Sequence, residues 1–135
     1  MTPIEIWRPV QGYEGLYEVS NLGRVKSLDR AVNNNGGVYI RPERLLRPSK
    51  GEYLQVILCK EGITTTYRIH RLVAISFPEI CGEYYEGAEV DHINGNAVDN
   101  RAVNLRITDH RTNMLNPYTR ERFNETIKRR KALCS

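Results

Sequence analysis

The most informative segment of the chain runs from Val90 to Asn116 and reads VDHINGNAVDNRAVNLRITDHRTNMLN. An aspartate and a histidine stand side by side near its start, as Asp91 and His92, and two asparagines follow 12 and 21 residues after that histidine, as Asn104 and Asn113. Asp91 and Asn113 offer two hard oxygen ligands of the kind that Mg²⁺ and Mn²⁺ take. His92, with an ordinary pKa of about 6.5, is able to take a proton from water at neutral pH.

The pattern around these residues predicts a strand–loop–strand–helix unit. Residues 89–92 and 104–108 favour strands, a long polar loop lies between them, and a helix is expected from about Asp109 with Thr108 as its N-cap. Such a helix would bring Asn113 back over the hairpin. Neighbours on a strand point to opposite faces, so Asp91 and His92 share a site only if the strand twists or ends there.

Spacing alone leaves other interpretations open, because residues 91–116 contain six asparagines. At that density two prescribed positions are both Asn by chance about one time in twenty. His92 can be a hydrogen-bonded structural histidine, and Asn94-Gly95 reads equally well as a tight turn. Asn104 can be a loop cap, and Asn113 a solvent-facing helix residue.

Signals for short strands fill the first half of the chain. The candidate strands alternate apolar and polar residues or are rich in β-branched residues, and Asn33–Gly37 reads as a loop between them. We expect one antiparallel sheet of about three to five short strands, with Trp7, Tyr13 and Tyr17 in its core. The candidate strands are residues 16–20, 25–28, 44–47, 53–58 and 64–69.

A short helix is expected after the sheet, over residues 70–77, with Pro78 as its stop. Its dense apolar residues are typical of a helix buried against a sheet. Residues 118–133 have a helical spacing of apolar residues in basic surroundings, which predicts a basic amphipathic helix or a frayed arm. The predicted fold class is therefore α+β: an N-terminal antiparallel sheet with a short helix, then a ββα unit and a basic C-terminal helix or arm.

The composition is that of a folded protein with room for one domain: 135 residues, 40% hydrophobic and 27% charged. No apolar run approaches the roughly 20 residues that span a bilayer, and the N-terminus lacks the features of a secretory signal. Cys59, Cys81 and Cys134 are scattered and odd in number, which argues against a disulfide framework and a thiolate zinc site. We expect three ordinary thiols in a reducing cytoplasm.

Charge is unevenly distributed along the chain, although the net charge is only +4. Residues 21–71 hold ten Lys or Arg against four Asp or Glu, whereas residues 72–99 hold six acids and no Lys or Arg. Residues 117–135 hold six basic and two acidic residues. Two basic segments around an acidic one favour a nucleic acid as partner, and solvated faces remain the simpler explanation of any single run.

Three segments resemble one nuclease family in the same order along the chain. DHINGN at 91–96, DNR at 99–101, NLR at 104–106 and Asn113 closely resemble the HNH motif, also called the ββα-metal or His-Me finger site. EIWRPV at 5–10 and GYEGLYEVSNLGRVKS at 12–27 resemble the NUMOD-type element that precedes HNH cores in homing endonucleases. HRLVA at 70–74 and FP at 77–78 are similar to the segment that joins the two. The resemblance covers residues 5 to about 116.

This resemblance implies metal-dependent hydrolysis of DNA that leaves 3′-hydroxyl and 5′-phosphate ends. His92 matches the general base that activates the attacking water, and Asn104 matches the asparagine that orients this histidine. Asp91 and Asn113 match the metal ligands. Many members have His-His where this chain has Asp91-His92, which favours an all-oxygen site for a single Mg²⁺ or Mn²⁺, and no zinc is expected. Phage-encoded and intron-associated nucleases are the usual carriers of this motif.

The cations of the two basic segments are the candidate DNA contacts, with the N-terminal strands and the 33–37 loop lying along a groove. Each cation alone can equally be a solubilising surface charge. A log–log slope of binding against salt near zero would refute the phosphate contacts. The candidates are Arg24, Lys26, Arg30, Arg41, Arg44, Arg47, Lys50, Lys128, Arg129, Arg130 and Lys131.

The leading hypothesis is an HNH endonuclease that nicks or cuts duplex DNA. In this interpretation residues 1–69 form a β-rich DNA-binding element, residues 70–116 the connecting helix and nuclease core, and residues 117–135 the basic helix or arm. The alternative is a catalytically inactive DNA-binding protein with an HNH fold, and a phage structural or assembly protein is a remote third. The expected partner is double-stranded DNA, and no membrane association is expected. The chain is expected to be a monomer or homodimer. The expected location is the cytoplasm, which is that of a bacterial host if the gene is phage-encoded.

Overall fold

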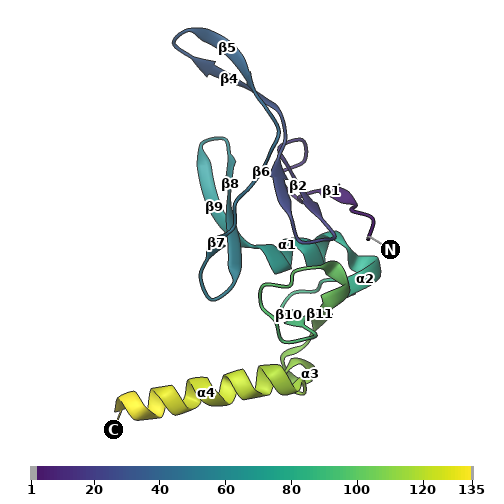
Figure 1. Ribbon diagram of the computed structural model, residues 1–135, viewed down its shortest axis with the longest axis vertical. Coiled ribbons are helices and arrows are strands. Elements are labelled where there is room, and N and C mark those ends of the chain that lie inside the picture. Colours follow the sequence, from purple (N-terminus) through teal and green to yellow (C-terminus); the bar gives the residue numbers. More distant parts are fainter. Residues whose placement is uncertain (1–2, 135) are drawn as a thin grey trace.

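The computed structural model describes residues 3–134, with side chains through residue 129. Short strands fill the first half of the chain, two short helices follow, and a β-hairpin then leads to a short helix and a long one (Figure 1). This arrangement confirms the predicted α+β class. The strands of the first half are β1 (Trp7–Pro9), β2 (Tyr17–Ser20), β3 (Val25–Ser27), β4 (Arg30–Asn34), β5 (Gly37–Arg41), β6 (Arg44–Leu45), β7 (Ser49–Lys50), β8 (Leu54–Lys60) and β9 (Ile63–Arg68).

These strands form separate antiparallel sheets rather than the single sheet that we expected. Over the described part of the chain, β1, β2, β3 and β6 pair in that order, β7, β8 and β9 form a second sheet, and β4 pairs with β5 alone. The β4–β5 hairpin extends away from the rest of the molecule (Figure 1), and every residue of β5 is exposed. Val38, Tyr39 and Ile40 of β5 are exposed, so the apolar side chains of this hairpin do not pack against either sheet.

The Asn33–Gly37 segment is the tip of this hairpin and not a loop throughout. Asn33 and Asn34 belong to β4 and Gly37 to β5, with Asn34 opposite Gly37 across a two-residue turn. The side chain of Asn34 accepts a hydrogen bond from the backbone N of Gly36 at 2.8 Å. Because Asn and Gly suit tight hairpin turns, both strands continue up to the turn.

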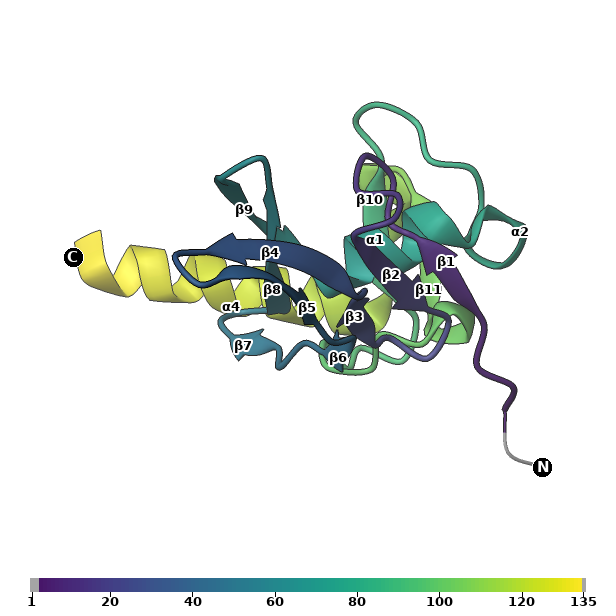
Figure 2. The same cartoon turned by 90° about the horizontal axis from the view of Figure 1, so that it is seen from above.

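One hydrophobic core joins the two halves of the chain. α1 (Ile69–Ser76) packs against the N-terminal strands on one side and against the hairpin of β10 (Glu89–His92) and β11 (Leu105–Thr108) on the other (Figures 1 and 2). Tyr13 and Tyr17 are core residues as predicted, whereas Trp7 is only half-buried. The helix predicted over 70–77 is confirmed as α1, and Pro78 begins α2 (Pro78–Cys81), where its missing N–H costs nothing.

The second half of the chain contains the predicted strand–loop–strand–helix unit. β10 (Glu89–His92) pairs with β11 (Leu105–Thr108), and a 3₁₀ turn over Ala102–Asn104 leads into β11. α3 spans His110–Asn113. Its N-cap is Asp109 rather than the predicted Thr108, because the Asp109 carboxylate accepts a hydrogen bond from the backbone N of Thr112 at 2.6 Å.

The C-terminal segment forms a helix, α4 (Pro117–Cys134), which starts beside the hairpin and extends away from it (Figure 1). Pro117 occupies its first position, and the side chain of Asn116 accepts a hydrogen bond from the backbone N of Tyr118 at 2.9 Å. These two residues define where the helix begins. None of the described helices combines the length and apolar character needed to cross a bilayer.

Candidate active site

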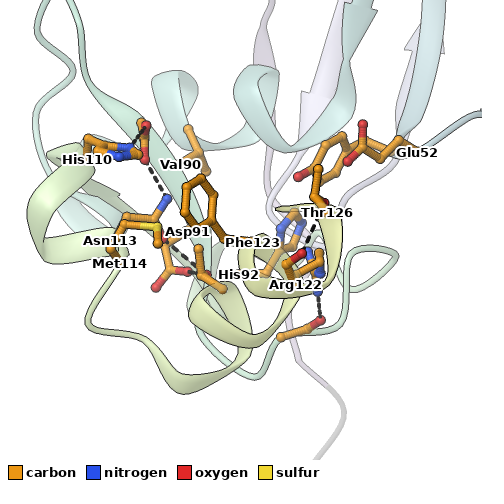
Figure 3. A pocket seen from close by; sticks show the side chains of 14 residues that line it. Glu52, Val90, Asp91, His92, His110, Asn113, Met114, Arg122, Phe123 and Thr126 are labelled. Carbon is orange, nitrogen blue, oxygen red and sulfur yellow. Dashed lines mark hydrogen bonds and ion pairs between the residues drawn. The ribbon is translucent and has the colours of Figure 1, made fainter. Parts of the chain in front are cut away.

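Asp91 and His92 meet at one cavity because β10 ends at His92. Within the hairpin, Asp91 lies opposite Arg106 and His92 opposite Leu105. Both side chains line a cavity of about 240 Å³, together with Asn113 and residues from α4 (Figure 3). Alternation along a continuing strand would have separated the two neighbours. The end of the strand at His92 removes that constraint, which is one of the two conditions under which the sequence allowed a shared site.

His92 is held with one ring nitrogen bonded and the other open. The side chain is 5% exposed, and its Nε2 lies 2.8 Å from Oδ1 of Asn100. With the Asn100 amide in this orientation its oxygen accepts, so Nε2 carries the proton and Nδ1 of the neutral ring is an acceptor. Nδ1 bonds to none of the described residues and is not among their fully buried unpaired atoms, so it is open to the cavity.

Burial lowers the pKa of His92, and this effect outweighs the hydrogen bond to Asn100, which raises it. The ring is therefore neutral at pH 7 and able to accept a proton. Two rings fix its plane: Tyr53 lies parallel at 6.1 Å between centroids and 8° between planes, and His70 meets it edge-on at 4.9 Å. Burial lowers the pKa of His70 to about 3, so this contact between two histidines carries no charge repulsion at neutral pH.

Asn104, predicted to orient His92, bonds within the β10–β11 loop that follows this histidine. Its Oδ1 accepts a hydrogen bond from the backbone N of Asn94 at 3.0 Å, and its Nδ2 donates to Asn94 Oδ1 and Asp99 O, both at 2.9 Å. The contact with the histidine ring is made by Asn100, four residues earlier in the same loop. The asparagine-rich segment contains no spacing signal that separates these two residues, and only their contacts do.

Asp91 is 2% exposed, and its carboxylate contacts three neighbouring side chains. Arg106 donates from Nε to Oδ2 at 2.7 Å, and Asn116 Nδ2 lies 3.0 Å from both carboxylate oxygens. The hydroxyl of Thr119 lies 3.3 Å from Oδ1. Asn116 also caps α4, so one side chain that the sequence reasoning missed ties the start of that helix to Asp91.

Asn113 turns its amide oxygen toward Asp91 because its nitrogen is engaged elsewhere. Nδ2 donates to Oε2 of Glu89 at 2.6 Å, and Oδ1 lies 3.3 Å from the hydroxyl of Thr119. Oδ1 of Asp91 lies at the same distance from that hydroxyl. A carboxylate oxygen and an amide oxygen thus converge on one point, with the chemistry that Mg²⁺ and Mn²⁺ take, and these residues fit the ion that the resemblance implies.

No cluster of three or more His, Cys, Asp or Glu side chains able to hold a metal is present among the described residues. A site built on Asp91 and Asn113 would therefore take further oxygen ligands from water and from phosphate, as Mg²⁺ sites usually do. The acidic partner of Asn113, Glu89, is also bonded to His110 Nδ1 at 2.8 Å. This second bond fixes the Glu89 carboxylate that orients the Asn113 amide.

Two of the predicted DNA-contacting cations are paired within the N-terminal sheet. Nζ of Lys26 lies 3.6 Å from Glu18, 3.5 Å from Glu43 and 4.3 Å from the centre of the Trp7 ring. Arg24 forms an ion pair and two hydrogen bonds with Glu5. These contacts neutralise much of both charges within the protein.

The other predicted cations are less engaged. Arg30 lies over the Tyr17 ring at 5.1 Å, and its Nε and Nη2 are buried with no partner among the described residues. The side chains of Arg130 and Lys131 lie outside the described residues. The remaining candidates are exposed on the β4–β5 hairpin, the following strands and α4, and form no ion pair within the described part of the chain: Arg41, Arg44, Arg47, Lys50, Lys128 and Arg129.

A strand that ends on an Asp-His pair, its antiparallel partner and a helix that returns an asparagine to the pair make the ββα arrangement of HNH-type nucleases. Two family models match the chain in succession. Residues 5–59 match the NUMOD4 motif, and residues 67–115 match the family described as HNH endonuclease. The chain belongs to the HNH endonuclease family and carries a NUMOD4 motif ahead of the HNH region, which confirms the resemblance seen in the sequence.

Individual relatives agree with this assignment. The chain is 37% identical over 118 residues to DNA endonuclease I-HmuI of Bacillus phage SP01, covering 87% of this chain and 60% of that protein. It is 38% identical over 106 residues to the uncharacterized HNH endonuclease L247 of Acanthamoeba polyphaga mimivirus, covering 75% of this chain and 23% of that protein.

A solved structure, described as DNA binding and cleavage by the HNH homing endonuclease I-HmuI, matches the fold with a TM-score of 0.68 at 36% identity. The match covers 86% of this chain and 59% of that one. The chain therefore spans about three fifths of the length of I-HmuI.

Proposed function

We propose that this chain is a metal-dependent DNA endonuclease of the HNH homing type, which hydrolyses phosphodiester bonds of duplex DNA with His92 as the general base. The observation that carries this proposal is the state of the His92 ring. Nε2 is bonded to Asn100, and Nδ1 is open to the cavity that Asp91 and Asn113 also line. The relative I-HmuI is named a DNA endonuclease, which supports the same reaction class.

In the proposed reaction a water molecule in the cavity gives its proton to Nδ1 of His92 as its oxygen attacks the phosphorus. The proton on Nε2 stays bonded to Asn100, so the ring is held while its charge changes. The negative charge of Asp91, the adjacent residue, favours the protonated ring. Asp91 and Asn113 would hold the divalent ion, which would stabilise the negative charge on the 3′-oxygen as the bond between that oxygen and phosphorus breaks.

The proposed partner is double-stranded DNA, contacted mainly by the exposed cations. Four of these cations lie on the N-terminal strands or between them, and two lie on α4: Arg41, Arg44, Arg47 and Lys50, then Lys128 and Arg129. Arg24 and Lys26 must exchange their internal acidic partners for phosphate, so we expect each to contribute less than an exposed cation. In this division, residues 1–69 bind DNA, residues 70–116 cleave it, and residues 117–135 add a basic helix. One site per chain hydrolyses one strand per encounter, which favours nicking by a monomer.

The test is cleavage of supercoiled plasmid DNA with Mg²⁺, Mn²⁺ or EDTA, with His92→Ala purified in parallel. The parent protein should nick the plasmid only with metal present, and His92→Ala should lose about 10²–10⁴-fold in rate while keeping its DNA affinity. Thr126→Val is the matched control, because Thr126 lines the same cavity but its hydroxyl donates to the carbonyl of Arg122 at 3.1 Å within α4.

Two results would contradict the proposal. Equal cleavage by the parent and by His92→Ala would indicate a contaminant or a different base. An absence of cleavage by the parent, with tight and salt-sensitive DNA binding, would establish the alternative of a catalytically inactive DNA-binding protein.

A further inference from the structure

The hydroxyl of Thr119 lies between the two proposed metal ligands. Its Oγ1 is 3.3 Å from Oδ1 of Asp91 and 3.3 Å from Oδ1 of Asn113. Thr119 stands on the first turn of α4, and the match to the HNH family ends before it, at residue 115. It is half-buried and lines the same cavity as His92.

A hydroxyl carries one proton and cannot donate to two acceptors at once. One of the two oxygens, Asp91 Oδ1 or Asn113 Oδ1, is therefore left facing the Thr119 oxygen lone pairs with no hydrogen between them. Around the three oxygens of Thr119, Asp91 and Asn113, the hydrogen-bond donors are the Thr119 hydroxyl and Asn116 Nδ2, which lies 3.0 Å from Asp91 Oδ1. A cation placed among them would use a lone pair from each.

The spacing of these oxygens matches that of neighbouring ligands around a divalent ion. In octahedral coordination at about 2.0–2.1 Å, adjacent ligand oxygens lie about 3 Å apart, and a slightly larger ion widens this separation. The two separations at Thr119 are both 3.3 Å, so a small inward movement suffices. Thr and Ser hydroxyls are established Mg²⁺ ligands at phosphate-processing sites.

The position of Thr119 is fixed from both sides. Asn116 caps the first turn of α4 and also bonds both oxygens of Asp91, which sets the helix start against the carboxylate. Glu89 turns the amide oxygen of Asn113 inward. Thr126, on the same helix, shows the ordinary alternative, because its hydroxyl bonds back to the carbonyl four residues earlier.

We propose that Oγ1 of Thr119 is a third protein ligand of the divalent metal, alongside Asp91 and Asn113. This inference rests on the proposed function, since it concerns the same ion. It makes α4 part of the metal site, so that the helix beyond the family match supplies a ligand as well as basic charge.

Mn²⁺ binding to the DNA-free protein, followed by the electron paramagnetic resonance signal of free Mn²⁺, tests this directly. Thr119→Val keeps the shape of the side chain and removes the oxygen, and it should weaken Mn²⁺ binding about tenfold or more. Thr119→Ser keeps the oxygen and should bind within about twofold of the parent. Thr126→Val is the matched control and should bind as the parent does. Thermal melting establishes that each variant is folded.

A second measurement does not depend on the valine variant. Thr119→Cys replaces the hydroxyl with a thiol, which prefers Cd²⁺ to harder ions. If position 119 contacts the metal, this variant should gain a thiolate-to-Cd²⁺ absorption band and a Cd²⁺ preference over Mn²⁺. Thr126→Cys adds a thiol to the same helix and controls for the natural cysteines.

Two outcomes overturn the inference. If Thr119→Val binds Mn²⁺ as tightly as the parent while Asp91→Asn loses binding, Thr119 is no ligand and the proposed metal site stands without it. The same conclusion follows if Thr119→Cys and Thr126→Cys respond equally to Cd²⁺. If the parent itself neither binds Mn²⁺ nor cleaves DNA, both the inference and the proposed function fail together.

Discussion

Replacing Asn100 tests what holds the proposed base in its working form. Oδ1 of Asn100 is the partner of His92 Nε2 at 2.8 Å, and both residues are buried, at 4% and 5% exposure. Asn100→Leu removes this acceptor and keeps the branched shape of the side chain, with two methyl groups in place of the amide oxygen and nitrogen. The Nε2 proton then has no partner, and the tautomer with the proton on Nδ1 becomes competitive. That tautomer cannot accept a proton from water at Nδ1.

The size of the effect follows from the burial of the pair. Leaving a buried donor unsatisfied costs about 1–3 kcal/mol. At about 1.4 kcal/mol per tenfold, this corresponds to a fall of about 5- to 150-fold in the rate of the chemical step. Asn100→Asp retains an acceptor for Nε2, so it should keep more activity than Asn100→Leu. DNA affinity should not change, since Asn100 is buried behind the ring.

Single-turnover nicking of supercoiled plasmid, with enzyme in excess over DNA, measures the chemical step. Asn104→Ala is the comparison, because Asn104 bonds Asn94 and Asp99 within the loop and should act through stability more than through rate. A parental rate for folded Asn100→Leu would refute this reasoning. A larger loss of rate for Asn104→Ala at equal melting temperature would return the orienting role to Asn104, as the family resemblance implied.

Three further changes test other contacts. Gly23 has φ +87, and an added Cβ would lie 3.0 Å from the Asn100 backbone. Gly23→Ala should therefore lower the free energy of unfolding by about 1–3 kcal/mol in denaturant titrations and slow nicking. An unchanged unfolding midpoint would contradict this. Gly95 has φ +75, and an added Cβ would overlap the Tyr118 side chain, so Gly95→Ala should release the start of α4. The expected sign is faster amide exchange over residues 118–122, and parental protection there would refute the packing. The pKa of His70 falls from 6.5 to about 3 on folding, so below about pH 6.5 the unfolded state binds the proton and the folded state does not. Stability should therefore decline as the pH falls, by about 2 kcal/mol at pH 5, and an equal decline in His70→Gln would show that another group is responsible.

The sequence identified the residues whose chemistry is distinctive. Asp91-His92 is an unusual pair at a strand end, and the helix after β11 returns Asn113 to it, so adjacency and periodicity were enough to bring them together. The grouping of a histidine with carboxylate and amide oxygens at one cavity was predictable for the same reason. The boundaries of the elements were less so: Asp109 and Thr108 are both good N-caps, and only the bond to Thr112 decides between them.

The residues that hold this chemistry in place were not predictable. Asn100, Asn104 and Asn116 have the same side chain and differ only in what they contact. Tyr53 and His70 reach the His92 ring from outside the hairpin, and no local period connects them to it. The division of the N-terminal strands into separate sheets was not predicted for a similar reason. A strand pattern in the sequence reports local propensity and does not identify the strand with which it pairs.

The N-terminal motif and the nuclease hairpin contact each other at the β2–β3 turn. The carbonyl of Asn21 accepts a hydrogen bond from the backbone N of Ala102 at 2.8 Å, and a Cβ added at Gly23 would lie 3.0 Å from the Asn100 backbone, closer than ordinary van der Waals contact. The β2–β3 turn therefore presses on the residue that holds His92. Gly23 therefore affects the position of Asn100 as well as the conformation of the turn, because a side chain there would push against Asn100. The N-terminal segment is thus part of the structure around His92, which gives a physical reason for the two motifs to form one folded unit around a shared core.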